Sequence, residues 1–160
     1  MDIGVPDFRE APLSWRDLEL VVRLGRLELL GRSQAQQLEY GEFNSELRRT
    51  WVSVADYLLC AKFGLPHSLS AEGRREAVRP PDLRLTRLLR NDFPYHFEPG
   101  IEHFVLWKCG PEPLTLTEID EARDRLLAEE GFAETLFYVN PPHLKSILDI
   151  DHAHIIARRG

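Results

Sequence analysis

The first third of the chain carries apolar residues at helical spacing. Steps of three and four residues separate the members of one apolar face: Leu18, Val21, Val22, Leu24 and Leu27. This period predicts an amphipathic helix. Ser14 is a suitable N-cap, with Asp17 at the third helical position, and Gly31 is a suitable stop.

Residues 33–63 continue the helical pattern, and a break is expected near Gly41. A second apolar face follows the same spacing: Trp51, Val54, Ala55, Leu58 and Leu59. Gly64 and Pro66 end this helical region. Residues 64–82 are polar and rich in helix breakers, so they are predicted to link two halves of the molecule.

The second half changes to strand spacing. One strand face would carry Ile101, His103, Val105 and Trp107, and the other Glu102, Phe104 and Leu106. Strands are also predicted over 135–139 and 151–157. Thr117 and Asp120 resemble a capping box that opens a helix between the first two strands. The sequence therefore predicts an α+β fold in which N-terminal helices pack on an antiparallel sheet. We expect one domain over 1–160, with a helical layer over 1–66 and a mixed half over 82–160.

Composition narrows the classes of function. The chain has 160 residues, a net charge of −6 and a pI near 5.5, which disfavours nucleic acid and anionic membranes as partners. No apolar run approaches the roughly 20 residues of a membrane helix, and residues 1–9 do not resemble a secretion signal, so a cytoplasmic protein is expected. No phosphate loop, dinucleotide fingerprint or nucleophile elbow is present, so no cofactor is expected.

The strongest chemical signal lies in the last predicted strand. His152, His154 and Arg158 would share one face of it, with the two imidazoles about 7 Å apart. Histidine is the side chain best suited to proton transfer near neutral pH, and Asp151 could orient an imidazole. The alternative is that both histidines are hydrogen-bonded structural residues.

Other candidate residues lie outside this strand. His103 shares a predicted strand face with Trp107, as a site residue or a buried structural one. If His103 met His152 and His154, the three could hold zinc, but no separate ligand signature is present and no metal is expected.

Two polar loops complete the candidate set. Phe93 and Tyr95 belong to a Pro-aromatic turn that either walls a pocket or only packs. Asn140 could fix a turn, and Lys145 could bind an anion, although a solvated loop is an equal alternative.

Several motifs carry a resemblance to a known family: Asn91-Asp92-Phe93-Pro94-Tyr95, Gly100-Ile101-Glu102-His103 with Trp107, Asn140-Pro141-Pro142, and Asp149-Ile150-Asp151-His152-Ala153-His154. Together they resemble an uncharacterised domain family of fungal proteins labelled N-acetylglucosamine-induced protein. The resemblance covers most of the chain and implies no particular chemistry.

The C-terminal half is more distantly similar to the histidine-triad superfamily. The order of strand, helix, strand ending in Asn140, and final His-x-His strand carries this similarity. It implies a histidine-triad-like fold and a nucleotide-phosphate site, with His152 at the phosphate-attacking position and His154 at the third histidine. Ile150 stands where the first histidine of the triad would be.

Three hypotheses about function follow. The first is a cofactor-independent enzyme acting on a small organic metabolite, such as a cyclase or isomerase, including pericyclic (Diels–Alder-type) ring formation in fungal secondary metabolism. In it, His152, His154 and Asp151 are catalytic and Arg158 holds an oxyanion. The remaining substrate-binding candidates are His103, Trp107, Asn140, Lys145, Phe93 and Tyr95. The second hypothesis is a histidine-triad-like hydrolase or nucleotidyl transferase with His152 as nucleophile, and the third is a non-enzymatic binding protein. The oligomeric state is left open between a monomer and a homodimer.

Overall fold

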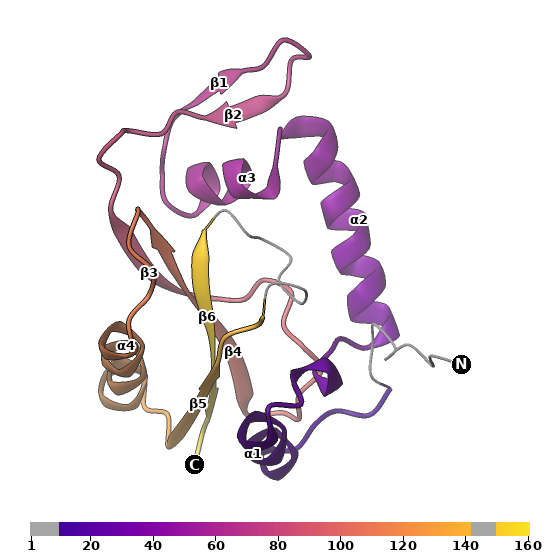
Figure 1. Ribbon diagram of the computed structural model, residues 1–160. Helices are drawn as coiled ribbons and strands as arrows, with labels where there is room; N and C mark the ends of the chain where they lie inside the picture. Colours follow the sequence, from indigo (N-terminus) through magenta and orange to yellow (C-terminus); the bar gives the residue numbers. More distant parts are fainter. Residues whose placement is uncertain (1–9, 142–149) are drawn as a thin grey trace.

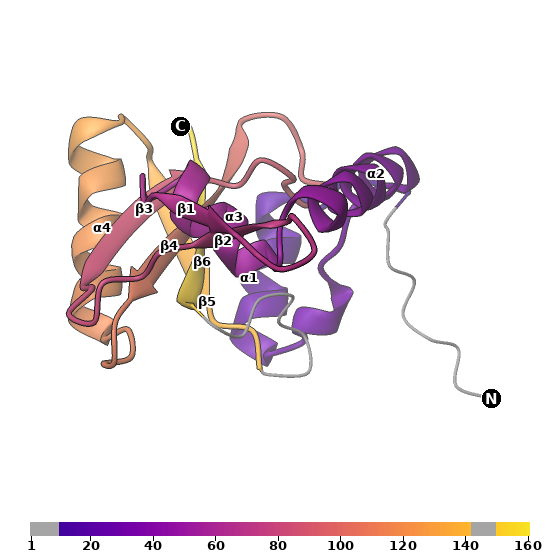
Figure 2. The same ribbon diagram turned by 90° about the horizontal axis from the view of Figure 1, so that it is seen from above.

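A four-stranded antiparallel sheet divides the molecule into two layers. The computed structural model describes residues 10–141 and 150–160. The sheet has the order β3 (Leu85–Arg90), β4 (Ile101–Cys109), β6 (Asp151–Arg158), β5 (Glu134–Tyr138). Helix α4 (Leu116–Glu129) lies on one side of this sheet, and the N-terminal helices lie on the other (Figures 1 and 2). The predicted α+β fold, with N-terminal helices on an antiparallel sheet, is confirmed.

The N-terminal layer contains three α-helices and a short 3-10 helix. These are α1 (Trp15–Leu24), η1 (Leu27–Leu29), α2 (Gln34–Thr50) and α3 (Val54–Ala61). The predicted cap of α1 is confirmed, because the Ser14 hydroxyl accepts from the Asp17 backbone and the Asp17 carboxylate accepts from the Ser14 backbone. Such reciprocal bonds satisfy two amides that no helical carbonyl reaches.

The predicted capping box at Thr117 and Asp120 was wrong. Helix α4 begins two residues earlier, where Thr115 caps it and Glu118 returns the bond to the Thr115 amide. A Ser or Thr followed three residues later by Glu is the commoner form of this motif, and the register with Glu118 satisfies it.

The predicted break near Gly41 was also wrong. Helix α2 continues through Gly41, and the chain turns at Trp51 before Ser53 caps α3. A glycine inside a helix costs only about 1 kcal/mol relative to alanine, and it keeps its backbone hydrogen bonds. The neighbouring residues of α2 therefore keep the chain helical at this glycine.

The segment 64–82 is more than a linker. It forms a hairpin of β1 (His67–Leu69) and β2 (Arg75–Ala77), which the sequence did not predict. Strand β2 is tied to the helical layer, since the Val52 amide donates to the Arg75 carbonyl over 2.9 Å. Strand β3 was missed as well. The hairpin strands have three residues each, and β3 is only partly buried with no strict alternation, so neither carries a clear strand pattern.

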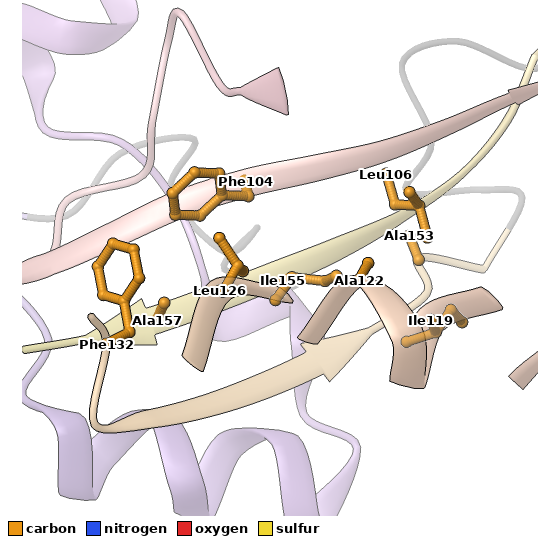
Figure 3. Packing of buried hydrophobic residues seen from close by; sticks show 9 residues of the cluster. All are labelled: Phe104, Leu106, Ile119, Ala122, Leu126, Phe132, Ala153, Ile155 and Ala157. Atoms are coloured by element: carbon orange, nitrogen blue, oxygen red, sulfur yellow. The ribbon is translucent and has the colours of Figure 1, made fainter. Parts of the chain in front are cut away.

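An apolar core fills the space between the sheet and α4 (Figure 3). Its residues come from β4, β6, α4 and the segment that follows: Phe104, Leu106, Ile119, Ala122, Leu126, Phe132, Ala153, Ile155 and Ala157. Ala153, Ile155 and Ala157 share the strand face opposite the histidines, and all three are fully buried. Burying an isoleucine side chain stabilises a fold by about 1.5–3 kcal/mol.

The opposite face of β6 carries two histidines flanked by apolar residues. Ile150 belongs to a cluster under α3, and Ile156 belongs to a cluster with Trp15 and Leu18 of α1. His152 and His154 lie between these two isoleucines at the same two-residue spacing. The described helices contain no apolar stretch long enough to cross a bilayer.

Candidate functional site

The two histidines of β6 are held against a cavity by their neighbours in the sheet. His152 pairs with Trp107 of β4, and His154 pairs with Val105 of β4 and Tyr138 of β5. Both imidazoles are almost fully buried. The Trp107 ring lies 4.7 Å from the His152 ring, and the Tyr138 ring stacks on His154 at 4.8 Å, so neither imidazole is free to turn toward bulk water.

A cavity of about 210 Å³ lies between this part of the sheet and the N-terminal helices. The sheet contributes Val105, Trp107, His152 and His154. Aromatic residues from α2, α3 and the loop after β3 form a second wall: Tyr40, Phe43, Tyr57, Phe93 and Tyr95. Ligand pockets usually measure about 300–1,000 Å³, so this cavity lies below that range and suits a compact small molecule.

His154 and Asn140, which line the cavity, form a hydrogen-bonded chain with His103 behind them. The Tyr95 backbone N–H can only donate, and it lies 3.3 Å from His103 Nδ1. Neutral His103 therefore carries its proton on Nε2, which donates across 2.8 Å to Nδ1 of His154. Neutral His154 is then protonated at Nε2 and faces the Asn140 side-chain amide 3.4 Å away. The structure places Asn140 Nδ2 at this distance, and a half-turn of the amide, which exchanges its nitrogen and oxygen, gives the His154 proton an acceptor.

The proton of His152 is fixed in a different way. Its Nδ1 lies 3.1 Å from the Ile150 backbone carbonyl, which can only accept. Nδ1 is therefore the protonated nitrogen of the neutral ring, and Nε2 carries the lone pair. The cavity thus presents one imidazole as an acceptor at Nε2 and another as a donor at Nε2. This difference in tautomer is what acid–base chemistry between two groups requires.

Burial keeps the groups around this chain uncharged. Burial, followed by the nearby Arg32 guanidinium, lowers the pKa of His103 from 6.5 to about 3. Burial likewise raises the pKa of Tyr95, opposed by Arg32 and by a hydrogen bond with Asn140. Burial also raises the pKa of Tyr138. At neutral pH, His103 is a neutral imidazole and both phenols are protonated.

Three cationic side chains and one acidic side chain line the cavity. Lys62 forms an ion pair with Asp92 over 2.7 Å. Arg90 is paired with Glu102. Arg32 donates from Nε to the Phe93 carbonyl over 2.9 Å and lies over the Tyr40 ring. The cavity therefore carries positive charge although the whole chain is acidic.

Most of the predicted site residues come together here. Six line the cavity: Phe93, Tyr95, Trp107, Asn140, His152 and His154. His103 lies immediately behind them, bonded to His154. Lys145 lies outside the described residues.

Two predicted residues lie elsewhere. The Asp151 carboxylate is on the other face of β6, where it accepts from the backbone amides of Leu114 and His152 at 2.7 and 3.0 Å. Arg158 shares the histidine face, but its end of the strand is covered by α1. There its guanidinium pairs with Glu134 over 2.9 Å and lies 5.3 Å from the Trp15 ring.

The helical side of the cavity was missed. Arg32, Tyr40, Phe43, Tyr57 and Lys62 all line it, and none was a candidate from sequence. Tyr40 and Phe43 are three residues apart on α2, a spacing that core packing produces equally often. Their place in the cavity wall depends on the contact of α2 with the loop at Phe93, which the sequence pattern does not show.

The chain is similar in sequence and in fold to known proteins. The family described as "Protein of unknown function (DUF3605)" matches residues 14–158, and the chain belongs to that family. The resemblance to a fungal family that includes N-acetylglucosamine-induced proteins agrees with this match.

Two yeast proteins are similar over most of the chain. One is "N-acetylglucosamine-induced protein 1" of Candida albicans, which is 25% identical and covers 92% of this chain and 68% of the relative. The other is "Uncharacterized protein YPL067C" of Saccharomyces cerevisiae, which is 29% identical and covers 89% of this chain and 77% of the relative. Among solved structures, the "Crystal Structure of HTC1" is similar with a TM-score of 0.58 and 23% identity, covering 92% of this chain and 85% of that one. The last similarity concerns the fold alone.

Proposed function

We propose that the protein is a cofactor-independent enzyme that acts on a small organic metabolite by proton transfer, with His152 as general base. The observation that carries this proposal is the hydrogen bond from His152 Nδ1 to the Ile150 carbonyl. It makes Nε2 the basic nitrogen, and the residue lines an aromatic cavity. A positioned imidazole of this kind contributes about 10²–10⁴-fold to a rate.

His154 supplies the complementary group. Its Nε2 proton is fixed by the chain from Tyr95 through His103, and a substrate oxygen would replace the Asn140 amide as the acceptor of this proton. A donor held in place before reaction stabilises negative charge that develops on a substrate oxygen. Removal of a proton by His152 and polarisation of an oxygen by His154 together favour an isomerisation through an enol or enolate.

The aromatic walls extend this proposal to ring formation. Tyr40, Phe43 and Phe93 pack edge to face or tilted, with centroids 4.8–5.4 Å apart, and form a rigid apolar surface. A cavity that holds one folded conformer lowers the entropy cost of a cyclisation, pericyclic cases included. Cyclisation or isomerisation is therefore the reaction class that we propose.

Turnover in a metabolite mixture tests this proposal. The purified protein is incubated with a yeast small-molecule extract in D₂O, and compounds are followed by liquid chromatography and mass spectrometry. We expect one compound to convert to an isomer whose mass differs only by incorporated deuterium. His152→Ala should abolish the conversion, whereas His67→Ala, at an exposed histidine of β1, should not.

Two outcomes would contradict the proposed function. Conversion that persists in His152→Ala would contradict the role of His152. If the extract is unchanged by every variant while a compound is retained on the immobilised protein, the protein is a binding protein and the enzyme proposal fails.

A histidine-triad-like phosphoramidase is the second candidate. The lone pair of His152 Nε2 would also serve as a nucleophile, and Arg32, Lys62 and Arg90 line the same cavity. In this reaction, Nε2 attacks phosphorus and the P–N bond of the substrate breaks, with the amine leaving after it takes a proton from water. A second water molecule then hydrolyses the N–P bond to His152 and releases the nucleoside monophosphate. Adenosine phosphoramidate is the probe. A covalent nucleotidyl adduct on His152, detected by mass spectrometry after an alkaline denaturing quench that preserves the acid-labile N–P bond, would favour it over the first candidate.

A further inference from the structure

We infer that the metabolite carries a single carboxylate and that Arg32 binds it, with an aromatic or otherwise flat unsaturated body lying against the α2 wall. This inference rests on the proposed function, in which the cavity is the substrate site. Arg32 precedes the N-cap of α2, and the sequence had assigned the anion to a different guanidinium, that of Arg158.

The Arg32 guanidinium is fixed by three contacts. Its Nε donates to the Phe93 carbonyl over 2.9 Å, and its Cζ lies 3.9 Å from the Tyr40 ring centroid and 5.0 Å from that of Tyr95. The side chain is half-buried. A guanidinium that is already stacked and anchored loses little further conformational entropy when it binds an anion.

The terminal nitrogens of Arg32 keep their donors. A guanidinium has five N–H donors, and the Phe93 carbonyl takes the one on Nε. Within residues 10–141 and 150–160, no carboxylate lies within ion-pair distance of Arg32 and no other hydrogen bond to it is formed. Lys62 and Arg90, the other cations of the cavity, are paired with Asp92 and Glu102. A half-buried guanidinium with two donors on one edge fits a carboxylate in two parallel bonds.

Arg32 also lies near the histidine chain. Its Cζ is 5.0 Å from the Tyr95 ring centroid, and the Tyr95 ring lies 4.9 Å from the His103 ring and 6.0 Å from the His154 ring. Its charge accordingly opposes protonation of His103 and favours ionisation of Tyr95 and Tyr138, although burial is the larger influence on the pKa of all three. A carboxylate on Arg32 would therefore lie close to the histidines.

Charge and shape select the class of anion. One cation without a carboxylate partner in the described chain balances one negative charge, which suits a carboxylate better than a dianionic phosphate monoester. The aromatic wall, in which Phe43 and Tyr57 pack edge to face with centroids 5.4 Å apart, favours a flat apolar body.

Paired probes test this inference without knowledge of the natural substrate. Isothermal titration calorimetry compares benzoate with benzamide, phenylacetate with phenylacetamide, and trans-cinnamate with trans-cinnamamide, with phenyl phosphate as a further probe. We expect the best carboxylate to bind about ten- to hundredfold more tightly than its amide, as charge-assisted hydrogen bonds predict. Arg32→Gln should remove this preference, and Arg158→Gln, the matched change at the other end of the face, should retain it.

Arg32→Lys is the control for a loss of binding that results from misfolding of Arg32→Gln. It keeps the charge and loses the planar stack, so it should weaken every probe yet preserve the preference for the carboxylate. Equal binding of all three acids and their amides to the wild type would overturn the inference, as would a preference that survives Arg32→Gln. Tighter binding of phenyl phosphate than of every carboxylate would replace a carboxylate with a phosphate substrate.

Failure of this inference differs from failure of the proposed function. A carboxylate preference that depends on Arg32, with no turnover by the wild type, would leave a carboxylate-binding protein. Turnover that depends on His152, with no such preference, would leave an enzyme for a neutral metabolite.

Discussion

The eight residues of strand β6 alternate between two faces, and the two faces have opposite roles. The face toward α4 carries Ala153, Ile155 and Ala157, which are fully buried in an apolar core (Figure 3). The face toward α1, α2 and α3 carries His152 and His154, buried almost as deeply but beside a cavity. The first face needs only volume and shape, whereas the second needs a partner for every polar atom. Burial alone therefore does not distinguish core from site, and the hydrogen-bond partners do.

The largest effect is expected on the apolar face. Ile155→Ala removes a fully buried side chain between β4 and α4, so it should lower the free energy of unfolding by about 2–5 kcal/mol. Urea titration followed by circular dichroism measures this change. Ile155→Val, as the graded control, should cost about 0.5–1.5 kcal/mol. A loss below 1 kcal/mol in Ile155→Ala would mean that this face is not tightly packed.

The next largest effect should come from breaking the histidine chain. His103→Leu fills a similar volume but leaves the Tyr95 amide and His154 Nδ1 without their partner. We expect a loss of about 1–3 kcal/mol from each unsatisfied buried group. His67→Leu, at an exposed histidine, should change the unfolding free energy by less than about 0.5 kcal/mol. Equal effects at the two positions would contradict the hydrogen-bonded chain.

Acid should act through the same residue. The pKa of His103 is about 3 in the folded chain, below the 6.5 of an ordinary histidine, so the unfolded chain binds the additional proton. This contribution to stability is complete above pH 6.5 and is lost as the pH falls toward 3, by at most about 1.4 kcal/mol per pH unit. His103→Gln should show a shallower fall between pH 6.5 and 4 in urea titrations. A wild-type profile that is no steeper than the variant's would contradict this prediction.

A small effect is expected at the end of the histidine face. Arg158 is 40% exposed and its ion pair with Glu134 lies at the surface, so Arg158→Gln should cost about 0–1 kcal/mol. It should also leave turnover of any substrate unchanged. Loss of turnover in Arg158→Gln would return this residue to the site, as the sequence had predicted.

The last prediction involves no change in stability. In ¹⁵N-labelled protein at neutral pH, His152 should be protonated at Nδ1, and His103 and His154 at Nε2. Two-bond ¹⁵N–¹H correlation spectra distinguish these tautomers. The same tautomer in His152 and His154 would remove the difference on which their separate roles as base and hydrogen-bond donor depend.

The sequence alone determined the elements whose signals are local. The alternation over β4 and β6 predicted which side chains share a face, and Ser14 with Asp17 marked the start of α1. The polar positions of the last strand pointed to His152 and His154 before any contact was known. Such patterns are readable because side-chain direction follows from the period of the backbone.

Only the tertiary structure decided what those histidines face. Phe93, Tyr95 and Asn140 became cavity residues when loops and strands distant in sequence met. Arg32 became one when the start of α2 met the loop at Phe93, 61 residues later. Arg158 lies on the same face as the two histidines, but it pairs with Glu134 because α1 covers that end of β6. Long-range packing sets these partners, and a sequence pattern of period two or 3.6 carries no information about them.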